Sequence, residues 1–269
     1  MALPFHLCQP GTPDGATAAP SCGACCGLYN FRDRTRETLH AALTRRTDMV
    51  APLPRTAEAF TKAARSLRRW EEAPLFPPVR LCPLLGFLDE ARTRVGCMAH
   101  PLSTGGPDLR DCGAYDTQTC QSFECPSFLW LDPPMARLVR AACLDWYLYG
   151  LVVTDVELVR GTKKLLEAAV AGPVDLDAIV ARPRALAAVA ALFARKGEPA
   201  AQRGEIFGRF AVDDLGEPVP RSLDYEALGG PAPEDDVVLC LGHAPTTRSA
   251  LKQLRALVRA HITAIVAEL

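Results

Sequence analysis

The stretch that decides the fold is Cys22-Gly23-Ala24-Cys25-Cys26-Gly27. It places three thiols within five positions, and its glycines allow the backbone to turn tightly around a bound ion. Two residues separate Cys22 from Cys25, a spacing that lets both sulfurs point into one turn, as in metal-binding knuckles. Adjacent side chains diverge, so we expect Cys25 and Cys26 to serve different ions, or different iron atoms of one cluster.

A second cysteine-rich stretch lies further along the chain. Residues 82–134 have no obvious periodicity, and an irregular segment of this length needs something other than a hydrophobic core to hold it. One zinc ion or one iron–sulfur cubane takes about four thiolates. Neither cysteine-rich stretch alone builds a complete metal site of the usual kind. We therefore expect a bound metal to link residues 22–26 to residues 82–125 and to contribute to the free energy of folding. The candidate metal ligands of both stretches are Cys22, Cys25, Cys26, Cys82, Cys97, His100, Cys112, Cys120 and Cys125.

The chain has 269 residues and 11 cysteines, eight of them between Cys22 and Cys125. This length allows one large domain or two modest ones. We divide it into a cysteine-rich metal-binding unit over residues 1–132, with a helical insertion at about 28–81, and a helical region over residues 133–269 that packs on it. The alternative for the cysteines, buried small side chains with adventitious disulfides, accounts less well for their clustering and spacing.

Helical patterns lie outside the cysteine stretches. We expect helices over residues 33–49 and 55–72, the second with an apolar stripe that includes Phe60, Ala63, Leu67 and Trp70. A further helical pattern runs from Pro134 to about Ala171, with a bend at Gly150.

The C-terminal part contains three helix signals. Asp175 is placed to cap a short helix through Ala181, and Pro183 to begin another that ends near Gly197. The spacing of apolar residues predicts a last helix over residues 251–269. We also expect a helix over 200–211, a surface loop over 212–235, and a strand or buried turn over 237–241. The predicted fold class is therefore mainly α, a helical body with an irregular cysteine-rich module.

Charge and hydropathy restrict the partners. Thirty Lys and Arg residues nearly balance 31 Asp and Glu residues, so a net charge of −1 gives no global field for nucleic acid. The local basic excess over residues 32–72 is interpreted as a solvated helix face rather than a nucleic-acid patch. No apolar run approaches the ~20 residues of a membrane span, and the N-terminus lacks the pattern of a signal peptide. We expect a cytoplasmic protein without membrane contact.

Several other residues have two interpretations. His100, which precedes Pro101, is either a metal ligand or a cap of its loop. Arg110 and Asp116 either support the thiolates by charge and hydrogen bonds or are ordinary loop residues. Cys143 and Cys240 are expected to be core thiols, because each lies in or beside an apolar stretch.

Four short motifs in order resemble a known family. They are Cys22-Gly23-Ala24-Cys25-Cys26-Gly27, Cys82-Pro83-Leu84-Leu85, Gly96-Cys97-x-x-His100-Pro101 and Cys120-Gln121-Ser122-Phe123. The pattern resembles the zinc- or iron-chelating family known as CxxCxxCC, or YkgJ-like, over about residues 22–126. The resemblance implies a transition metal bound by cysteines, either zinc or an iron–sulfur cluster. Ala19 stands where the family pattern begins with a cysteine, and Cys8 or Cys112 are the candidates to replace it.

Three function classes follow. The first is a cysteine-ligated metalloprotein whose helical half binds a small molecule or a protein. The second, implied by a branch of the family that includes flagellin lysine methylases, is an iron–sulfur enzyme related to protein lysine methylases. The third is a zinc-stabilised partner- or nucleic-acid-binding protein, which the net charge does not favour. The sequence contains no G-x-S-x-G, P-loop, G-x-G-x-x-G or H-E-x-x-H motif, so no catalytic residue is assigned.

Overall fold

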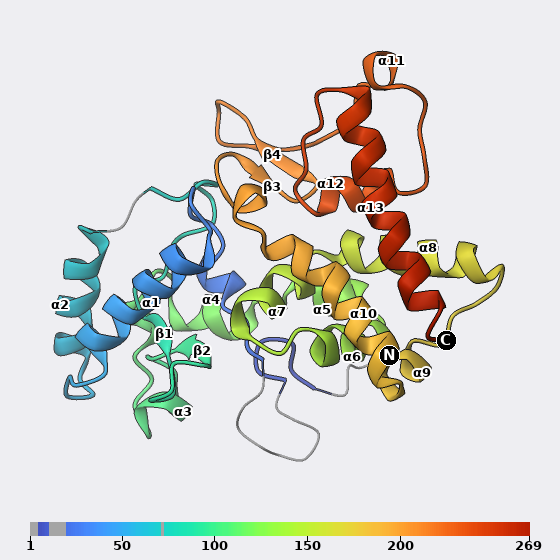
Figure 1. Cartoon of the computed structure of the whole chain (residues 1–269). Coiled ribbons are helices and arrows are strands. Elements are labelled where there is room, and N and C mark those ends of the chain that lie inside the picture. Colours follow the sequence, from blue (N-terminus) through green and yellow to red (C-terminus); the bar gives the residue numbers. More distant parts are fainter. Residues whose placement is uncertain (1–4, 11–19, 71–72) are drawn as a thin grey trace.

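A computed structural model describes residues 5–10, 20–70 and 73–269 (Figure 1). It is mainly helical, as predicted, with two small antiparallel sheets. Residues 1–4 and 11–19 of the predicted cysteine-rich unit, and residues 71–72 at the end of the predicted helix over 55–72, lie outside the described residues. No helix in the described part of the chain is long and apolar enough to cross a bilayer.

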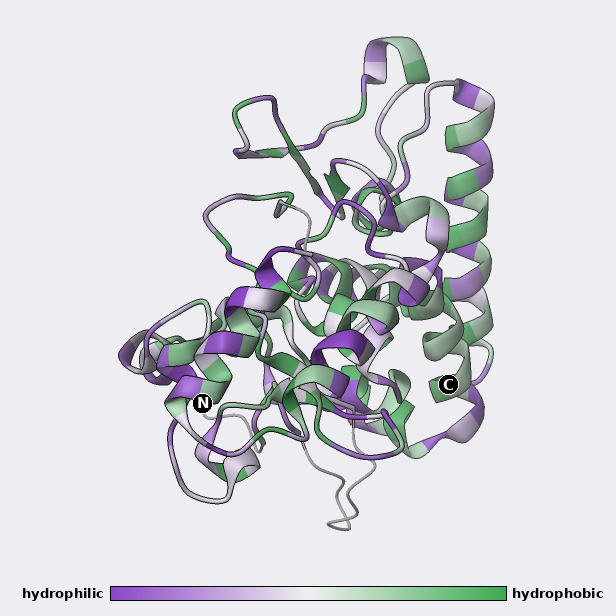
Figure 2. Ribbon diagram, turned by 90° about the vertical axis from the view of Figure 1, so that its left-hand side faces the viewer, coloured by the Kyte–Doolittle hydropathy of each residue, from purple (hydrophilic) through white to green (hydrophobic). Residues whose placement is uncertain are grey.

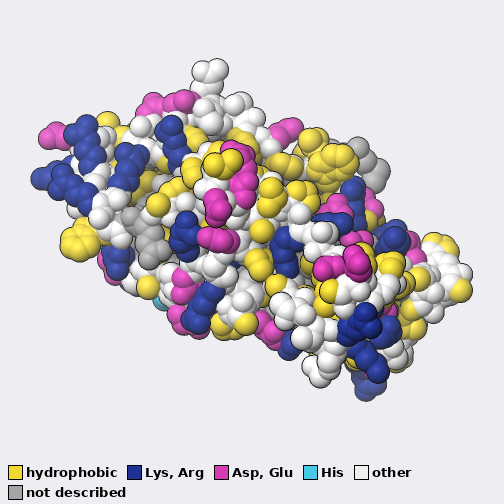
Figure 3. Space-filling model, turned by 90° about the horizontal axis from the view of Figure 1, so that it is seen from above, with side chains coloured by type: hydrophobic (Ala, Val, Ile, Leu, Met, Phe, Trp, Pro, Cys, Tyr) yellow, Lys and Arg dark blue, Asp and Glu magenta, His cyan; other side chains and the backbone are white. Residues whose placement is uncertain are grey.

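The two N-terminal helices lie where the sequence predicts them, as α1 (Arg36–Val50) and α2 (Ala57–Arg68). The hydroxyl of Thr56 caps α2. Most of the predicted stripe on α2 is buried, but the place of Trp70 in it was wrong, because Trp70 lies beyond the helix end and is 69% exposed. Figure 3 shows basic side chains gathered at the end of the molecule where α2 lies, and acidic and basic side chains interspersed elsewhere on that face.

The second cysteine stretch is less irregular than predicted. It contains strands β1 (Leu85–Phe87) and β2 (Val95–Cys97), and helices α3 (Pro101–Thr104), η2 (Arg110–Cys112), α4 (Thr117–Ser122) and α5 (Pro126–Trp130). The 3₁₀ turn η1 (Ala24–Cys26) belongs to the first stretch. These elements have three to six residues each, too few for a periodic pattern to be visible.

The helical pattern from Pro134 to Ala171 forms three helices, so the prediction of one bent helix was wrong. They are α6 (Pro133–Ala142), α7 (Trp146–Val153) and α8 (Val156–Val170). The breaks occur where the side chains of Asp145 and Asp155 accept hydrogen bonds from amides of the next helix, 2.9 and 3.0 Å away. Gly150 lies inside α7 and faces Tyr29, so the glycine serves close packing rather than a bend.

The C-terminal part continues with helices α9 (Leu176–Ala181), α10 (Pro183–Ala194), η3 (Arg195–Gly197) and η4 (Pro199–Gln202). Strands β3 (Ile206–Phe207), β4 (Phe210–Val212) and β5 (Pro218–Pro220) follow, then α11 (Tyr225–Leu228), α12 (Asp235–Cys240) and α13 (Arg248–Val266). The Asp175 cap of α9, the start of α10 at Pro183 and the position of the last helix are confirmed. Along α13, hydrophobic and hydrophilic residues alternate in Figure 2, as expected of a helix with one buried face.

Three predictions in this part were wrong, and one of them is the surface loop over residues 212–235, which contains β5 and α11. Residues 200–211 were expected to be helical but begin a three-stranded sheet, because Gly204 and Gly208 adopt positive φ values of 75° and 57° that a helix does not contain. Residues 237–241, expected as a strand or buried turn, mostly belong to α12. Periodicity cannot identify such a short run when every side chain in it is buried.

Helix α7 joins the N-terminal part to the helical body. One large buried apolar cluster contains residues from both predicted units, with α7 among its most buried elements. The hydroxyl of Tyr29 donates to the carbonyl of Trp146 at 2.9 Å, and the hydroxyl of Tyr149 donates to the carbonyl of Leu7 at 2.8 Å. Because these bonds are buried, they fix the segments on either side of the first cysteines to a rigid helix.

Candidate metal centre

The backbone brings the two cysteine stretches together. The amide of Cys82 donates to the carbonyl of Cys26 at 2.9 Å, and the amide of Cys22 donates to the carbonyl of Cys8 at 2.9 Å. Gly27 makes the first contact possible: its φ is +82°, and a Cβ there would lie 2.4 Å from the carbonyl oxygen of Arg80. The turn predicted around Cys22–Gly27 is therefore tight, and the backbone of Arg80 and Leu81 packs directly against it.

Short elements of the second stretch bring in the remaining thiols. Cys97 ends β2 and pairs with Leu85 across the β1–β2 hairpin. The Asp116 side chain caps α4 by accepting from the amide of Thr119 at 2.7 Å, which fixes the helix that contains Cys120. Cys125 occupies the position before the first turn of α5. This cap is an ordinary role for a loop aspartate, and the charge of Asp116 raises the pKa of Cys120 rather than favouring its thiolate.

The first thiol group consists of Cys8, Cys22, Cys25 and Cys125. Hydrogen bonds from the thiols of Cys26 and Cys8 lower the pKa of Cys25 to about 3. The bond to Cys25 and burial raise the pKa of Cys8, and the charges of Cys22, Cys25 and Cys125 raise it further. Burial raises the pKa of Cys22, with the charges of Cys25 and Cys125 acting in the same direction. A hydrogen bond thus joins the thiols of Cys8 and Cys25, and the charges of Cys22 and Cys125 act on Cys8.

The second thiol group consists of Cys26, Cys82, Cys97 and Cys120. The hydrogen bond to Cys25 and burial raise the pKa of Cys26, and charges on Cys25, Cys82 and Cys97 add to this. Burial raises the pKa of Cys97 to about 12, and Cys82 and Cys120 contribute repulsion. Burial and Cys82 raise the pKa of Cys120. The two groups adjoin one another, because the thiols of Cys25 and Cys26 share a hydrogen bond and the charge of Cys25 also raises the pKa of Cys120.

Thiolates are the ligands that zinc ions and iron–sulfur clusters take. All 11 cysteines are free thiols. Thiolates packed this closely repel one another, and a bound cation would remove the repulsion and stabilise the ionised form. Each group has the number of thiols that one zinc ion or one iron–sulfur cluster takes. Among the described residues, however, no three His, Cys, Asp or Glu side chains already surround a point at which one ion would sit.

Arg110 lies beside the second thiol group. Its guanidinium donates to Asp108 at 2.9 Å, and it interacts electrostatically with Cys120 and Cys97. The positive charge lowers the pKa of Cys120, against the effects of burial and Cys82. Arg110 therefore favours thiolate at this end of the site, in addition to its ion pair with Asp108.

Two predicted ligands are oriented differently from the rest. The thiol of Cys112 donates to the carbonyl of Ala57 on α2 at 3.5 Å. The Nδ1 atom of His100 accepts from the amide of Leu102 at 3.2 Å and caps α3, which was the alternative interpretation of this residue. Neither takes part in the thiol interactions described above, so their role as ligands stays a prediction.

One member of the first thiol group was missing from the predicted ligand set. Cys8 lies between two anchors, the buried hydrogen bond to the carbonyl of Leu7 and its own carbonyl bond to Cys22. A sequence signal for it was the missing first cysteine of the family pattern, for which Cys8 and Cys112 were the candidates. The structure places Cys8 among the thiols. Cys143 and Cys240 are fully buried in the apolar core, as predicted.

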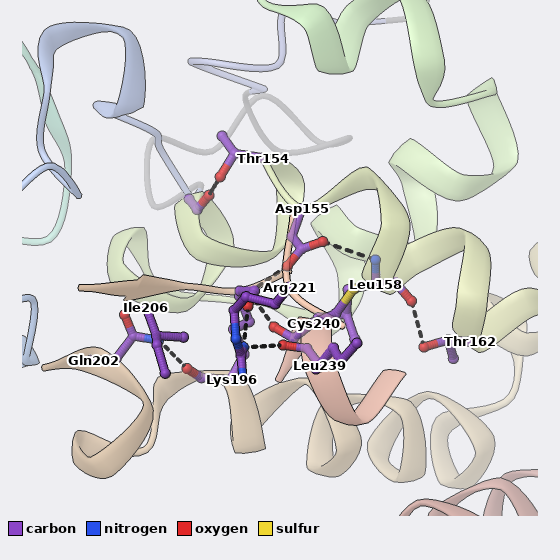
Figure 4. Close-up of polar contacts among 12 residues, drawn as sticks. Thr154, Asp155, Leu158, Thr162, Lys196, Gln202, Ile206, Arg221, Leu239 and Cys240 are labelled. Atoms are coloured by element: carbon purple, nitrogen blue, oxygen red, sulfur yellow. Dashed lines mark hydrogen bonds and ion pairs between the residues drawn. The ribbon is translucent and has the colours of Figure 1, made fainter. Parts of the chain in front are cut away.

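A second polar cluster lies away from these thiols (Figure 4). The ammonium of Lys196 forms an ion pair with Asp155 and donates to the carbonyl of Cys240 at 2.5 Å. A Cβ at Gly208 would lie 2.8 Å from both charged groups, so the β3–β4 turn covers them. The cluster joins the start of α8, the end of η3 and the end of α12, and its arrangement is that of a structural ion pair.

Comparison with known proteins gives no relative. No protein-family model, curated protein or solved structure matches the chain. The resemblance to the CxxCxxCC family therefore stays a prediction that depends on the order of four short motifs.

Proposed function

We propose that this protein is a cysteine-ligated metalloprotein that binds a transition metal at each of its two thiol groups. The observation that supports the proposal is that eight free thiols, from segments as far apart as Cys8 and Cys125, interact with one another by charge and hydrogen bonds. The chain is long enough to bury a hydrophobic core without covalent or metal links, so the formation of a core does not by itself explain why these thiols lie in one region. Eight neighbouring thiols without a cation would also repel one another on ionisation.

Metal would stabilise the part of the fold that has the shortest elements. The β1–β2 hairpin, α4 and α5 have three to six residues each, and such elements are marginal without tertiary support. Ligation would fix them to the η1 turn and to the segment of Cys8. The free energy of metal binding would then be part of the free energy of folding.

The second candidate is an iron–sulfur enzyme related to protein lysine methylases. Exposure favours it: Cys25 and Cys120 are exposed, so each thiol group reaches the surface. A structural zinc site is usually closed, whereas a catalytic centre needs a side that substrate can approach. In both candidates the same residues hold the metal, and the identity of the metal separates them.

Metal content tests the proposal. The full chain is purified without oxygen, and zinc, iron and acid-labile sulfide are measured together with the visible absorption spectrum. We expect stoichiometric metal at two centres. Iron with sulfide and a broad visible band supports the iron–sulfur candidate, and colourless protein with zinc supports the structural site. Protein that is folded and free of both metals would contradict the proposal.

Matched cysteine variants test which thiols are ligands. Cys22→Ser removes one thiol of the first group and Cys97→Ser removes one of the second, so each variant should lose about half of the metal. Cys112→Ser is the control, because its thiol faces the carbonyl of Ala57 and lies in the same cysteine-rich stretch. Loss of metal in Cys112→Ser equal to that in Cys97→Ser would show that the two groups are assigned wrongly.

A further inference from the structure

An apolar cavity lies between the N-terminal part and the three-stranded sheet. Its volume is about 240 Å³ and it is partly open to solvent. Four segments that are distant in the sequence form its walls, near η1, in the loop of residues 73–81, at Thr154 after α7, and at β3 to β5. The turn after β4 closes against the loop, since a Cβ at Gly216 would lie 3.0 Å from Pro77. Residues of its lining include Ala24, Tyr29, Phe76, Phe207, Phe210 and Val212.

The polar groups beside this cavity are already satisfied. The side-chain amide of Asn30 donates to the carbonyls of Phe76 and Val79 at 2.8 and 2.6 Å. The oxygen of the same side chain accepts from the amide of Phe76 at 2.8 Å. The hydroxyl of Thr154 donates back into its own helix at 2.7 Å (Figure 4), and that of Tyr29 donates to α7. A water molecule or a charged ligand would therefore find few partners here.

Size and shape narrow the occupant further. Protein interiors are close-packed, and voids much larger than a water molecule are few. This cavity is about one and a half times the ~150 Å³ of an apolar cavity that accepts benzene. Four aromatic side chains, Tyr29, Phe76, Phe207 and Phe210, contribute to its walls, and aromatic rings pack well by edge or offset contacts.

We propose that this cavity binds a neutral aromatic small molecule about the size of indole. Burial of its ring would supply the affinity, and the satisfied polar groups would disfavour charged analogues. The wall at Ala24 belongs to η1, whose next two residues are Cys25 and Cys26, so the ligand would lie against the turn that contains these thiols. The proposal does not depend on whether the thiols hold metal.

Calorimetric titration of the purified full chain with indole tests this site. We expect saturable binding with one molecule per chain and a negative heat-capacity change, the sign of apolar burial. Indole-3-carboxylate is the charged probe, and we expect it to bind at least about tenfold more weakly, because its carboxylate would lose hydration without gaining a partner.

Cavity-filling variants locate the binding. Val212→Phe extends a ring into the cavity, and we expect it to weaken indole binding by about tenfold or more. Val219→Phe is the matched control on the neighbouring strand, where the side chain is exposed and outside the lining, and it should bind like the parent. If Val212→Phe does not fold, as judged by circular dichroism, Val79→Phe fills the cavity from the opposite wall. Absence of indole binding, equal binding of both probes, or unchanged binding in the filled variants would overturn the proposal.

Discussion

Gly150 gives the sharpest test of how the N-terminal part is joined to the helical body. A Cβ added at Gly150 would lie 1.8 Å from the hydroxyl oxygen of Tyr29 and 2.5 Å from its Cζ atom. Tyr29 is buried and donates to Trp146 on the same helix, so the ring can move away from Gly150 only by giving up this hydrogen bond. Gly150→Ala should therefore push Tyr29 out of its place against α7.

The size of the effect follows from three contributions. Forcing a methyl group into a packed site costs about 1–3 kcal/mol. Loss of the Tyr29 hydrogen bond leaves a buried hydroxyl without a partner, at a cost of about 1–3 kcal/mol. Alanine is favoured over glycine inside a helix by about 1 kcal/mol, which opposes both losses. We expect Gly150→Ala to lower the free energy of unfolding by about 1–5 kcal/mol.

Urea unfolding followed by circular dichroism measures this change, and a double-mutant cycle with Tyr29→Ala tests its cause. Tyr29→Ala alone should cost about 3–5 kcal/mol. In that background the clash is absent, so Gly150→Ala should become stabilising by about 0.5–1 kcal/mol. Gly161→Ala in α8 is the control, because its Cβ would meet only a methyl group of Val237 at 3.1 Å, and it should change stability by less than about 1 kcal/mol. An equal cost of Gly150→Ala in both backgrounds would refute the reasoning.

Two further predictions concern buried charges. Lys196→Met leaves Asp155 buried without its partner and should destabilise the fold by about 3–5 kcal/mol in urea unfolding. The control Lys163→Met, at a more exposed ion pair, should cost less than about 1 kcal/mol. Equal costs of the two variants would contradict the structural role of the buried pair. Burial by itself would raise the pKa of Asp235, but hydrogen bonds from Arg255 and a backbone amide hold it below its usual value. The carboxylate therefore stabilises the fold above its unfolded pKa of about 3.9, and this contribution is lost as the pH falls through the lower folded pKa. Asp235→Asn should lower the melting temperature at pH 7, and its melting temperature should approach that of the parent protein below about pH 4. A difference in melting temperature that stays constant with pH would contradict this assignment to the Asp235 carboxylate.

Elements with local signals were predictable from the sequence. Asp175 and Pro183 act within one helical turn of their own position, so their neighbours in the sequence were enough to place α9 and α10. The last helix has an apolar face over several turns, which makes its period clear. In each case the interactions that determine the element are contained in the segment itself.

Elements that depend on distant contacts were not predictable in the same way. Gly150 suggested a bend because a glycine weakens a helix, and only the approach of Tyr29 from residues far away explains it. The run at 237–241 is buried on every side, so its hydrophobicity contained no period. The meaning of a residue in these places depends on a partner that the local sequence does not specify.

In the candidate metal centre, too, the local features were predictable from the sequence and the features that depend on tertiary contacts were not. The spacing from Cys22 to Cys26 is local and indicated a tight turn with diverging thiols, and the structure shows that turn. Cys8 and Cys112 were both candidates from the sequence. Tertiary contacts separate them, because Tyr149 and Cys22 hold the segment of Cys8 near the thiols, whereas the thiol of Cys112 turns toward α2.

The order of the eight thiols along the chain has a consequence for biosynthesis. Cys8, Cys22, Cys25 and Cys26 all leave the ribosome roughly a hundred residues before the last members of their groups, Cys120 and Cys125. At about 5–20 residues per second, the early thiols wait for about 5–20 s before the last member of their group is synthesised. During that interval four of the eight thiols are exposed to solution without the full set of their neighbours. A reducing surrounding, or a chaperone that covers them, would keep these sulfurs from reacting before their neighbours arrive.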